Sequence, residues 1–201
     1  FTENPLTRKF RFRSKFTLTH TGAPVHRVED YAQLLLMSHN LSIAMDTAPV
    51  RGNEEAHGDF IAPFSTLGEA DSWSGERWAE LVGRLPEKPT LLALKQDEAK
   101  AQAMAEKLGI PCKAILPHEV ADVLGPHTTL YAVDGLLPQL AAMAGCPCRV
   151  LMASRLSERY APLGEGHRTF FNHKPCHPCY QQRCDMNQHC TDGVSVDDIL
   201  A

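Results

Sequence analysis

The sequence predicts an α/β protein with a parallel, Rossmann-like sheet and a four-cysteine metal-binding tail. Two observations lead to this prediction. Short apolar segments alternate with helical segments from about residue 59 onward, and four cysteines crowd together near the end of the chain. Continuous apolar strands that alternate with helices are typical of βαβ units, whose parallel strands are buried on both faces.

Five apolar segments are predicted as strands, and helices are predicted between them. The predicted strands are Phe60–Pro63, Thr90–Leu94, Lys113–Leu116, Thr128–Val133 and Arg149–Met152. The predicted helices are Gly75–Leu85, Asp97–Gly109, Glu119–Leu124 and Leu137–Ala144. Nucleotides that bind such sheets lie beyond the carboxyl ends of the strands, against helix N-termini. A nucleotide-type ligand is therefore expected at that edge.

The segment before the sheet is predicted to contain one amphipathic helix, Val25–Met37. Apolar residues recur at helical spacing in it: Val28, Tyr31, Leu34 and Leu35. Residues 39–58 are polar and interrupted by proline and glycine, which predicts an exposed linker.

The charge of the chain disfavours one class of function. The formal net charge is −4, and 43% of the 201 residues are apolar, which indicates a globular protein without an overall basic field. Phe1–Pro24 interleaves basic and aromatic residues, as a nucleic-acid patch can. Because the rest of the chain is acidic, we interpret this stretch as a strand or linker with a solvated face. No apolar run reaches the length of a membrane span.

The cysteine count favours a reducing compartment. The chain has seven cysteines, an odd number that would leave one unpaired in a secreted protein. Cys112, Cys146 and Cys148 lie among apolar or small residues, where a thiol behaves as a small hydrophobe. We therefore expect a cytoplasmic protein.

The other four cysteines have the spacing of a metal site. Cys176, Cys179, Cys184 and Cys190 form a Cys-x2-Cys-x4-Cys-x5-Cys pattern. Two thiolates from one tight turn and two later ones complete a tetrahedral set that suits one zinc or iron ion. Histidines stand near enough to replace a thiolate, at positions His173, His177 and His189. No ligand position is left open, so the expected role is structural; disulfides or unligated thiols are the alternative.

Several segments resemble a known family of enzymes. Ile61–Leu81 and Asp134–Pro147, followed by the Pro162–Gly164 segment and the cysteine spacing, resemble the C-terminal half of glycosyltransferase family 9. That family includes the ADP-heptose:lipopolysaccharide heptosyltransferases. His26–Leu35 is similar to the family's helix near the junction of its two domains, so the resemblance covers nearly the whole chain.

The resemblance implies the C-terminal half of a GT-B fold, in which two Rossmann-like domains face each other. Three regions are expected: residues 1–54 as the end of a missing N-terminal domain with a helix and linker, 55–165 as the nucleotide-sugar-binding domain, and 166–201 as the cysteine-rich tail. The chain is then expected to be a C-terminal fragment. The catalytic carboxylate and the acceptor site would lie in the missing domain, so no catalytic residue is assigned here.

The resemblance and the chemistry of helix N-termini together indicate residues that would bind the nucleotide-sugar donor. Hydroxyl, amide and ammonium groups near a helix start can bind phosphate oxygens. Ser65 and Thr66 are equally natural as loop or cap residues, and Lys95, Glu98 and Gln139 as ordinary surface residues. The expected donor-binding residues are Ser65, Thr66, Lys95, Glu98, Asp134, Gly135 and Gln139.

The chain departs from the family pattern where donor phosphates would bind. Asp71 replaces a lysine, Gly135-Leu136 replaces a Ser/Thr-Gly pair, and Gln139 replaces a histidine. A carboxylate in place of a lysine reverses the charge that stabilises a departing diphosphate. Lys95 is a candidate for the replacement charge.

Two functions remain open on the sequence. The resemblance implies a glycosyltransferase that moves a sugar, with heptose as the expected one, from an ADP-sugar donor to a lipopolysaccharide-core or protein acceptor. A lipid-linked acceptor would place the protein at the periphery of the inner membrane. The alternative is a non-catalytic binding or assembly module that keeps the fold and the metal site but has lost donor chemistry.

Overall fold

A computed structural model of the chain describes residues 26–39, 42, 48–50, 52–68, 72–172, 174–184 and 190–201. The chain divides into two compact units. The larger contains residues 47–157 and 161–201, and the smaller contains residues 1–46 with 158–160. The predicted strand or linker at Phe1–Pro24 lies outside the described residues.

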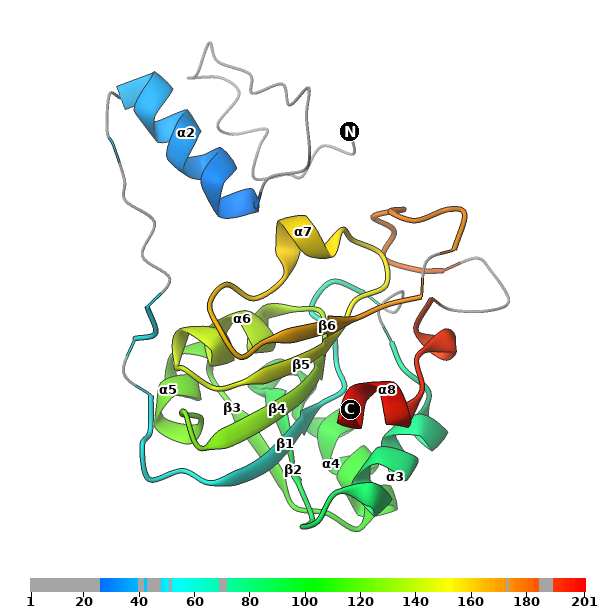
Figure 1. Cartoon of the computed structure of the whole chain (residues 1–201). Coiled ribbons are helices and arrows are strands. Elements are labelled where there is room, and N and C mark those ends of the chain that lie inside the picture. The colour runs from blue at the N-terminus through cyan, green and yellow to red at the C-terminus, as the bar shows by residue number, and fades with distance from the viewer. Residues whose placement is uncertain are drawn as a thin grey trace. The chain divides into compact units, whose positions relative to one another are not determined.

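The described part of the larger unit is built on a six-stranded parallel sheet in the order β3-β2-β1-β4-β5-β6 (Figure 1). This order confirms the predicted Rossmann-like sheet. The first five strands occupy the predicted segments, whereas β6 was not predicted. The strands are β1 (Gly58–Ala62), β2 (Thr90–Leu94), β3 (Cys112–Ile115), β4 (Thr128–Val133), β5 (Cys148–Leu151) and β6 (Arg168–Phe170).

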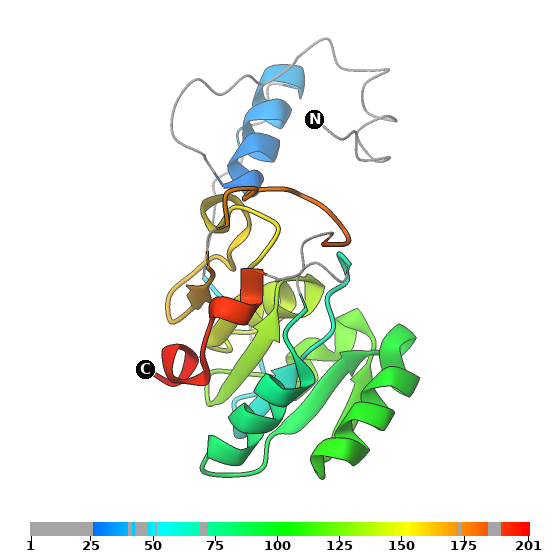
Figure 2. The ribbon, with the colours of Figure 1, turned by 90° about the vertical axis from the view of Figure 1, so that its right-hand side faces the viewer.

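Helices cover both faces of the sheet, as the apolar strands require (Figures 1 and 2). On one face lie α3 (Gly75–Arg84), α4 (Glu98–Leu108) and α8 (Val196–Leu200), and on the other lie α5 (Val120–Val123) and α6 (Leu136–Met143). Among the described residues, three short stretches are 3-10 helices: η2 (Lys95–Asp97), η3 (Pro117–Glu119) and η4 (Cys190–Gly193). All four helices predicted between strands are confirmed.

Local sequence signals begin and end the helices beside β1 and β2. Ser74 begins α3, because its side chain accepts a hydrogen bond from the Arg77 N–H at 3.3 Å. Gly109 ends α4 with a φ of 64°, a left-handed conformation that glycine adopts without steric cost.

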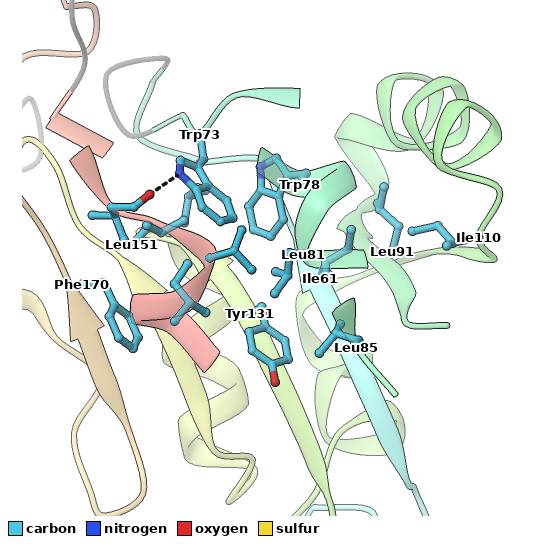
Figure 3. Packing of buried hydrophobic residues seen from close by; sticks show 14 of the residues in the cluster. Ile61, Trp73, Trp78, Leu81, Leu85, Leu91, Ile110, Tyr131, Leu151 and Phe170 are labelled. Carbon is cyan, nitrogen blue, oxygen red and sulfur yellow. Dashed lines mark hydrogen bonds between the residues drawn. The ribbon is translucent and has the colours of Figure 1, made fainter. Parts of the chain in front are cut away.

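The main core lies between the sheet and the layer formed by α3, α4 and α8 (Figure 3). Trp78 and Leu81 of α3 are 1% and 0% exposed. Trp73 meets Trp78 edge-on, with ring centroids 5.1 Å apart, which is a favourable aromatic geometry. Alternate strand residues complete this side of the core: Ile61, Leu91, Ala93, Tyr131, Val133, Leu151 and Phe170.

The C-terminal helix α8 is part of this core. Val196 and Ile199 are buried in it. The Trp73 indole N–H donates to the Val194 carbonyl at 3.3 Å, the dashed line in Figure 3. Arg84 and Asp197 form an ion pair at 2.7 Å. The last residues of the chain are therefore anchored to α3.

The smaller unit contains α2 (Arg27–His39), which corresponds to the predicted amphipathic helix. Asp30 is a buried residue of this helix. Its carboxylate forms ion pairs with Arg27 and with Arg159 of α7 (Ser157–Tyr160). The α7 turn was not predicted. Among the described helices, none is long and apolar enough to cross a membrane.

We predict that Leu81→Ala lowers the free energy of unfolding by about 2–5 kcal/mol, because it opens a cavity at a fully buried position. Urea denaturation followed by tryptophan fluorescence measures this change. Leu116→Ala is the matched control: Leu116 is 44% exposed, so a change within about 0.5 kcal/mol is expected. Equal losses for the two variants would contradict the core described here.

Candidate functional site

The neighbouring strands β1 and β4 create a switch point in the sheet. The chain leaves β1 through α3 toward β2, and it leaves β4 through α6 toward β5, on the opposite side. The loops after β1 and β4 therefore diverge at the carboxyl edge of the sheet. Ligands of open α/β sheets bind in the crevice that such divergence creates.

Ser65 ties these two loops together. Its hydroxyl donates to the carbonyl of Asp134 at 2.7 Å and accepts from the backbone N–H of Leu67 at 3.0 Å. One side chain thus holds the loop after β1 against the end of β4. The O–H donor of Ser65 is thus used within the protein, and it positions the two loops.

Thr66 makes a second tie, to the start of α6. Its Oγ1 accepts from the backbone N–H of Leu136 at 3.1 Å. A Cβ at Gly135 would lie 3.2 Å from both N and Oγ1 of Thr66, so glycine permits this close approach. The structure therefore brings Ser65, Thr66, Asp134 and Gly135 together at one edge of the sheet.

The N-terminus of α6 offers fewer backbone donors than the sequence suggests. The N–H of Leu136 is bound to Thr66, and Pro138 has no N–H. The side chain of Leu136 is 39% exposed at the helix start. Gln139 lies on the first turn of the same helix. An incoming phosphate would thus meet an apolar side chain beside a partly used helix terminus.

Lys95 and Glu98 pair with each other. They lie after β2, and the Lys95 ammonium is 2.6 Å from the Glu98 carboxylate. Both side chains are about half exposed, so the pair adds little stability. The replacement cation expected at Lys95 is therefore partly neutralised by its own neighbour.

Arg155, which the sequence did not indicate, supplies a cation at the switch point. Its Nε and one Nη each lie 3.0 Å from Oδ2 of Asp134. The Asp134 side chain is 1% exposed and that of Arg155 is 20% exposed. Asp134 is thus a buried anchor, and Arg155 is the partner that reaches the surface. An isolated arginine after a strand has no motif by which it could have been found.

The four clustered cysteines are described, but they do not show a metal site. Cys176 is exposed, Cys179 and Cys184 are half-buried, and Cys190 is buried. Within the described ranges, no three His, Cys, Asp or Glu side chains are placed to hold an ion. Burial raises the pKa of the Cys190 thiol, and the other three cysteines raise that pKa further through their charge. The four thiols are therefore electrostatic neighbours without ligating geometry.

The cysteine segment contacts the loop after β1 and the loop after β5. The Tyr180 N–H donates to the Ser154 carbonyl at 2.9 Å, and a ring nitrogen of His177 lies 3.1 Å from the Arg155 carbonyl. A Cβ at Gly68, in the loop after β1, would lie 2.3 Å from the Gln182 carbonyl. The segment therefore packs on the backbone beside Arg155.

Three residues named from the sequence lie outside the described residues: Asp71, His173 and His189. The structure therefore says nothing about the reversed charge expected at Asp71.

Comparison with known proteins shows similarity to solved glycosyltransferases. No family model and no curated protein matches the chain. A glycosyl transferase family 9 structure from Veillonella parvula has a TM-score of 0.65 at 15% identity over 95% of this chain and 63% of that one. E. coli heptosyltransferase WaaC with ADP-2-deoxy-2-fluoro heptose has a TM-score of 0.57 at 14% identity, covering 90% and 56%. E. coli ADP-heptose lps heptosyltransferase II has a TM-score of 0.50 at 15% identity, covering 74% and 45%.

The chain shares its fold with these glycosyltransferases. The expected resemblance to family 9 is thereby confirmed at the level of fold. The chain spans about half to two-thirds of the length of these structures. At identities of 14–15%, the roles of individual residues are not transferred from these structures to this chain.

We predict that Thr66→Val lowers the free energy of unfolding by about 1 kcal/mol, because it removes the acceptor for the first N–H of α6. Thr66→Ser keeps the hydroxyl and should lose less than half as much. Urea denaturation of the three proteins measures the difference. Equal stability of the valine and serine variants would show that this hydrogen bond does not hold the two loops.

Proposed function

We propose that this chain is the donor-binding half of a glycosyltransferase. It would hold an ADP-sugar, with heptose as the sugar, for transfer to a lipopolysaccharide-core or protein acceptor. The observation that carries this proposal is the cluster of Ser65, Thr66, Asp134 and Gly135 at the switch point of the sheet. Nucleotides bind open α/β sheets at such a point.

The fold comparison supports the same class of ligand. Structures of E. coli WaaC, which shares the fold, contain ADP or an ADP-heptose analogue. On this proposal the chain works with a second Rossmann-like domain in a GT-B arrangement. The acceptor site and the catalytic carboxylate would lie in that second domain.

A non-catalytic binding or assembly module is the second candidate. The start of α6 favours it, since Leu136 is exposed there and the local N–H donors are reduced by Thr66 and Pro138. The ion pair between Lys95 and Glu98 also weakens the expected positive charge. A protein that kept the fold without donor binding would show these features.

Calorimetric titration separates the two candidates. A donor-binding protein should bind ADP and ADP-heptose with dissociation constants of about 1 mM or lower, since about 1 mM is the weak end of typical KM values for enzyme substrates. A titration with GDP tests selectivity for the base. Absence of detectable ADP and ADP-heptose binding, by a protein that includes the second domain, would favour the non-catalytic module.

We also propose that Cys176, Cys179, Cys184 and Cys190 bind one structural zinc or iron ion. Four thiolates suit either ion. The Cys-x2-Cys-x4-Cys-x5-Cys spacing supports a common site. So does the anchoring of Cys190, whose neighbour Thr191 donates to the Ser72 carbonyl.

Elemental analysis of the purified protein tests the metal proposal. About one zinc or iron per chain is expected, and Cys176→Ser should reduce this content severalfold, since one of four ligands is lost. Cys112→Ser is the control, because Cys112 lies on β3 outside the cluster. Thiolates must be deprotonated to bind an ion, so retention of the ion should fall as the pH is lowered. Equal metal content in the two variants would contradict the site.

A further inference from the structure

We propose that Arg155 supplies the positive charge that holds the diphosphate of the donor, with Asp134 as its positioning residue. The inference rests on the proposed donor-binding function and names the group that recognises the phosphates. It assigns the role that Lys95 was expected to fill to a residue on a different loop.

The first support is the position of Arg155. Two of its guanidinium nitrogens lie 3.0 Å from Asp134 Oδ2, and Asp134 immediately precedes Gly135 and the start of α6. The guanidinium therefore lies at the carboxyl edge of β4, beside the loop that Ser65 and Thr66 hold in place. Diphosphates bind at this edge in open α/β sheets.

The second support is the difference in exposure within the ion pair. The carboxylate of Asp134 is 1% exposed, so a ligand cannot reach it. The Arg155 side chain is 20% exposed, and this part is what a ligand can contact. A buried ion pair loses its hydration, a cost that apolar side chains in the same place would not have. The contribution of the Arg155–Asp134 pair to folding stability is therefore a weak explanation for its presence.

The third support is that Arg155 is held in place from two sides. Asp134 binds the side chain. The cysteine segment holds the backbone, through the His177 ring at the Arg155 carbonyl and the Tyr180 N–H at the Ser154 carbonyl. A cation fixed before the ligand arrives stabilises phosphate charge without a reorganisation cost. A guanidinium also matches the geometry of phosphate oxygens better than an ammonium does.

Titration of ADP, AMP and adenosine against single variants tests this role. Arg155→Gln should weaken ADP binding about ten- to hundredfold, the effect of losing a hydrogen bond to a charged group, and leave adenosine binding within about twofold. The ADP affinity of Arg155→Lys should lie between those of the parent and of Arg155→Gln. Arg84→Gln breaks an exposed ion pair at the far end of α3 and should change the affinity for neither ADP nor adenosine.

A double variant covers the case in which Arg155→Gln does not fold, since it takes the guanidinium away from a buried carboxylate. Arg155→Gln with Asp134→Asn removes both charges and should recover stability in urea denaturation, yet ADP binding should stay weak. Recovery of ADP affinity in the double variant would overturn the proposal. So would ADP affinity within twofold of the parent in Arg155→Gln, or an equal loss for ADP and adenosine. Failure of the parent protein to bind ADP would instead contradict the proposed function itself.

Discussion

Because β1 pairs in parallel with β4 from Gly58–Thr128 to Ala62–Ala132, both strands end at the same edge of the sheet. Because β2 lies beside β1 and β5 lies beside β4, the loops after β1 and β4 leave in opposite directions, one through α3 and the other through α6. The hydrogen bonds of Ser65 and Thr66 follow from this pairing, since each joins a loop that comes from β1 to the end of β4. A shift of the register by one residue would separate these groups and turn the buried side chains of β4 to the other face.

The apolar strands made most of this fold predictable. Each of the first five strands contains a short apolar run, and such runs have few alternatives once helices separate them. The sixth, Arg168–Phe170, is three residues long and only Phe170 is buried, so it has no pattern to detect. The turn Ser157–Tyr160 was missed for the same reason of length.

The site was predictable only as far as the topology determines it. Ser65, Thr66, Asp134 and Gly135 follow predicted strands, and the rule for carboxyl edges places them together. Charge partners follow no such rule. Lys95 has an acidic neighbour three residues away, and the two pair with each other. Arg155 meets Asp134 across 21 positions of sequence, a contact that only the folded chain creates.

The packing of α8 changes how the cysteine segment should be understood. Cys176–Cys184 follows β6, which is paired with β5, and precedes Val196 and Ile199, which are buried in the core. Both ends of the segment are therefore fixed by the fold, and the conformational entropy of closing this loop is lost when the domain folds. An ion bound there would order a loop whose two ends are already fixed.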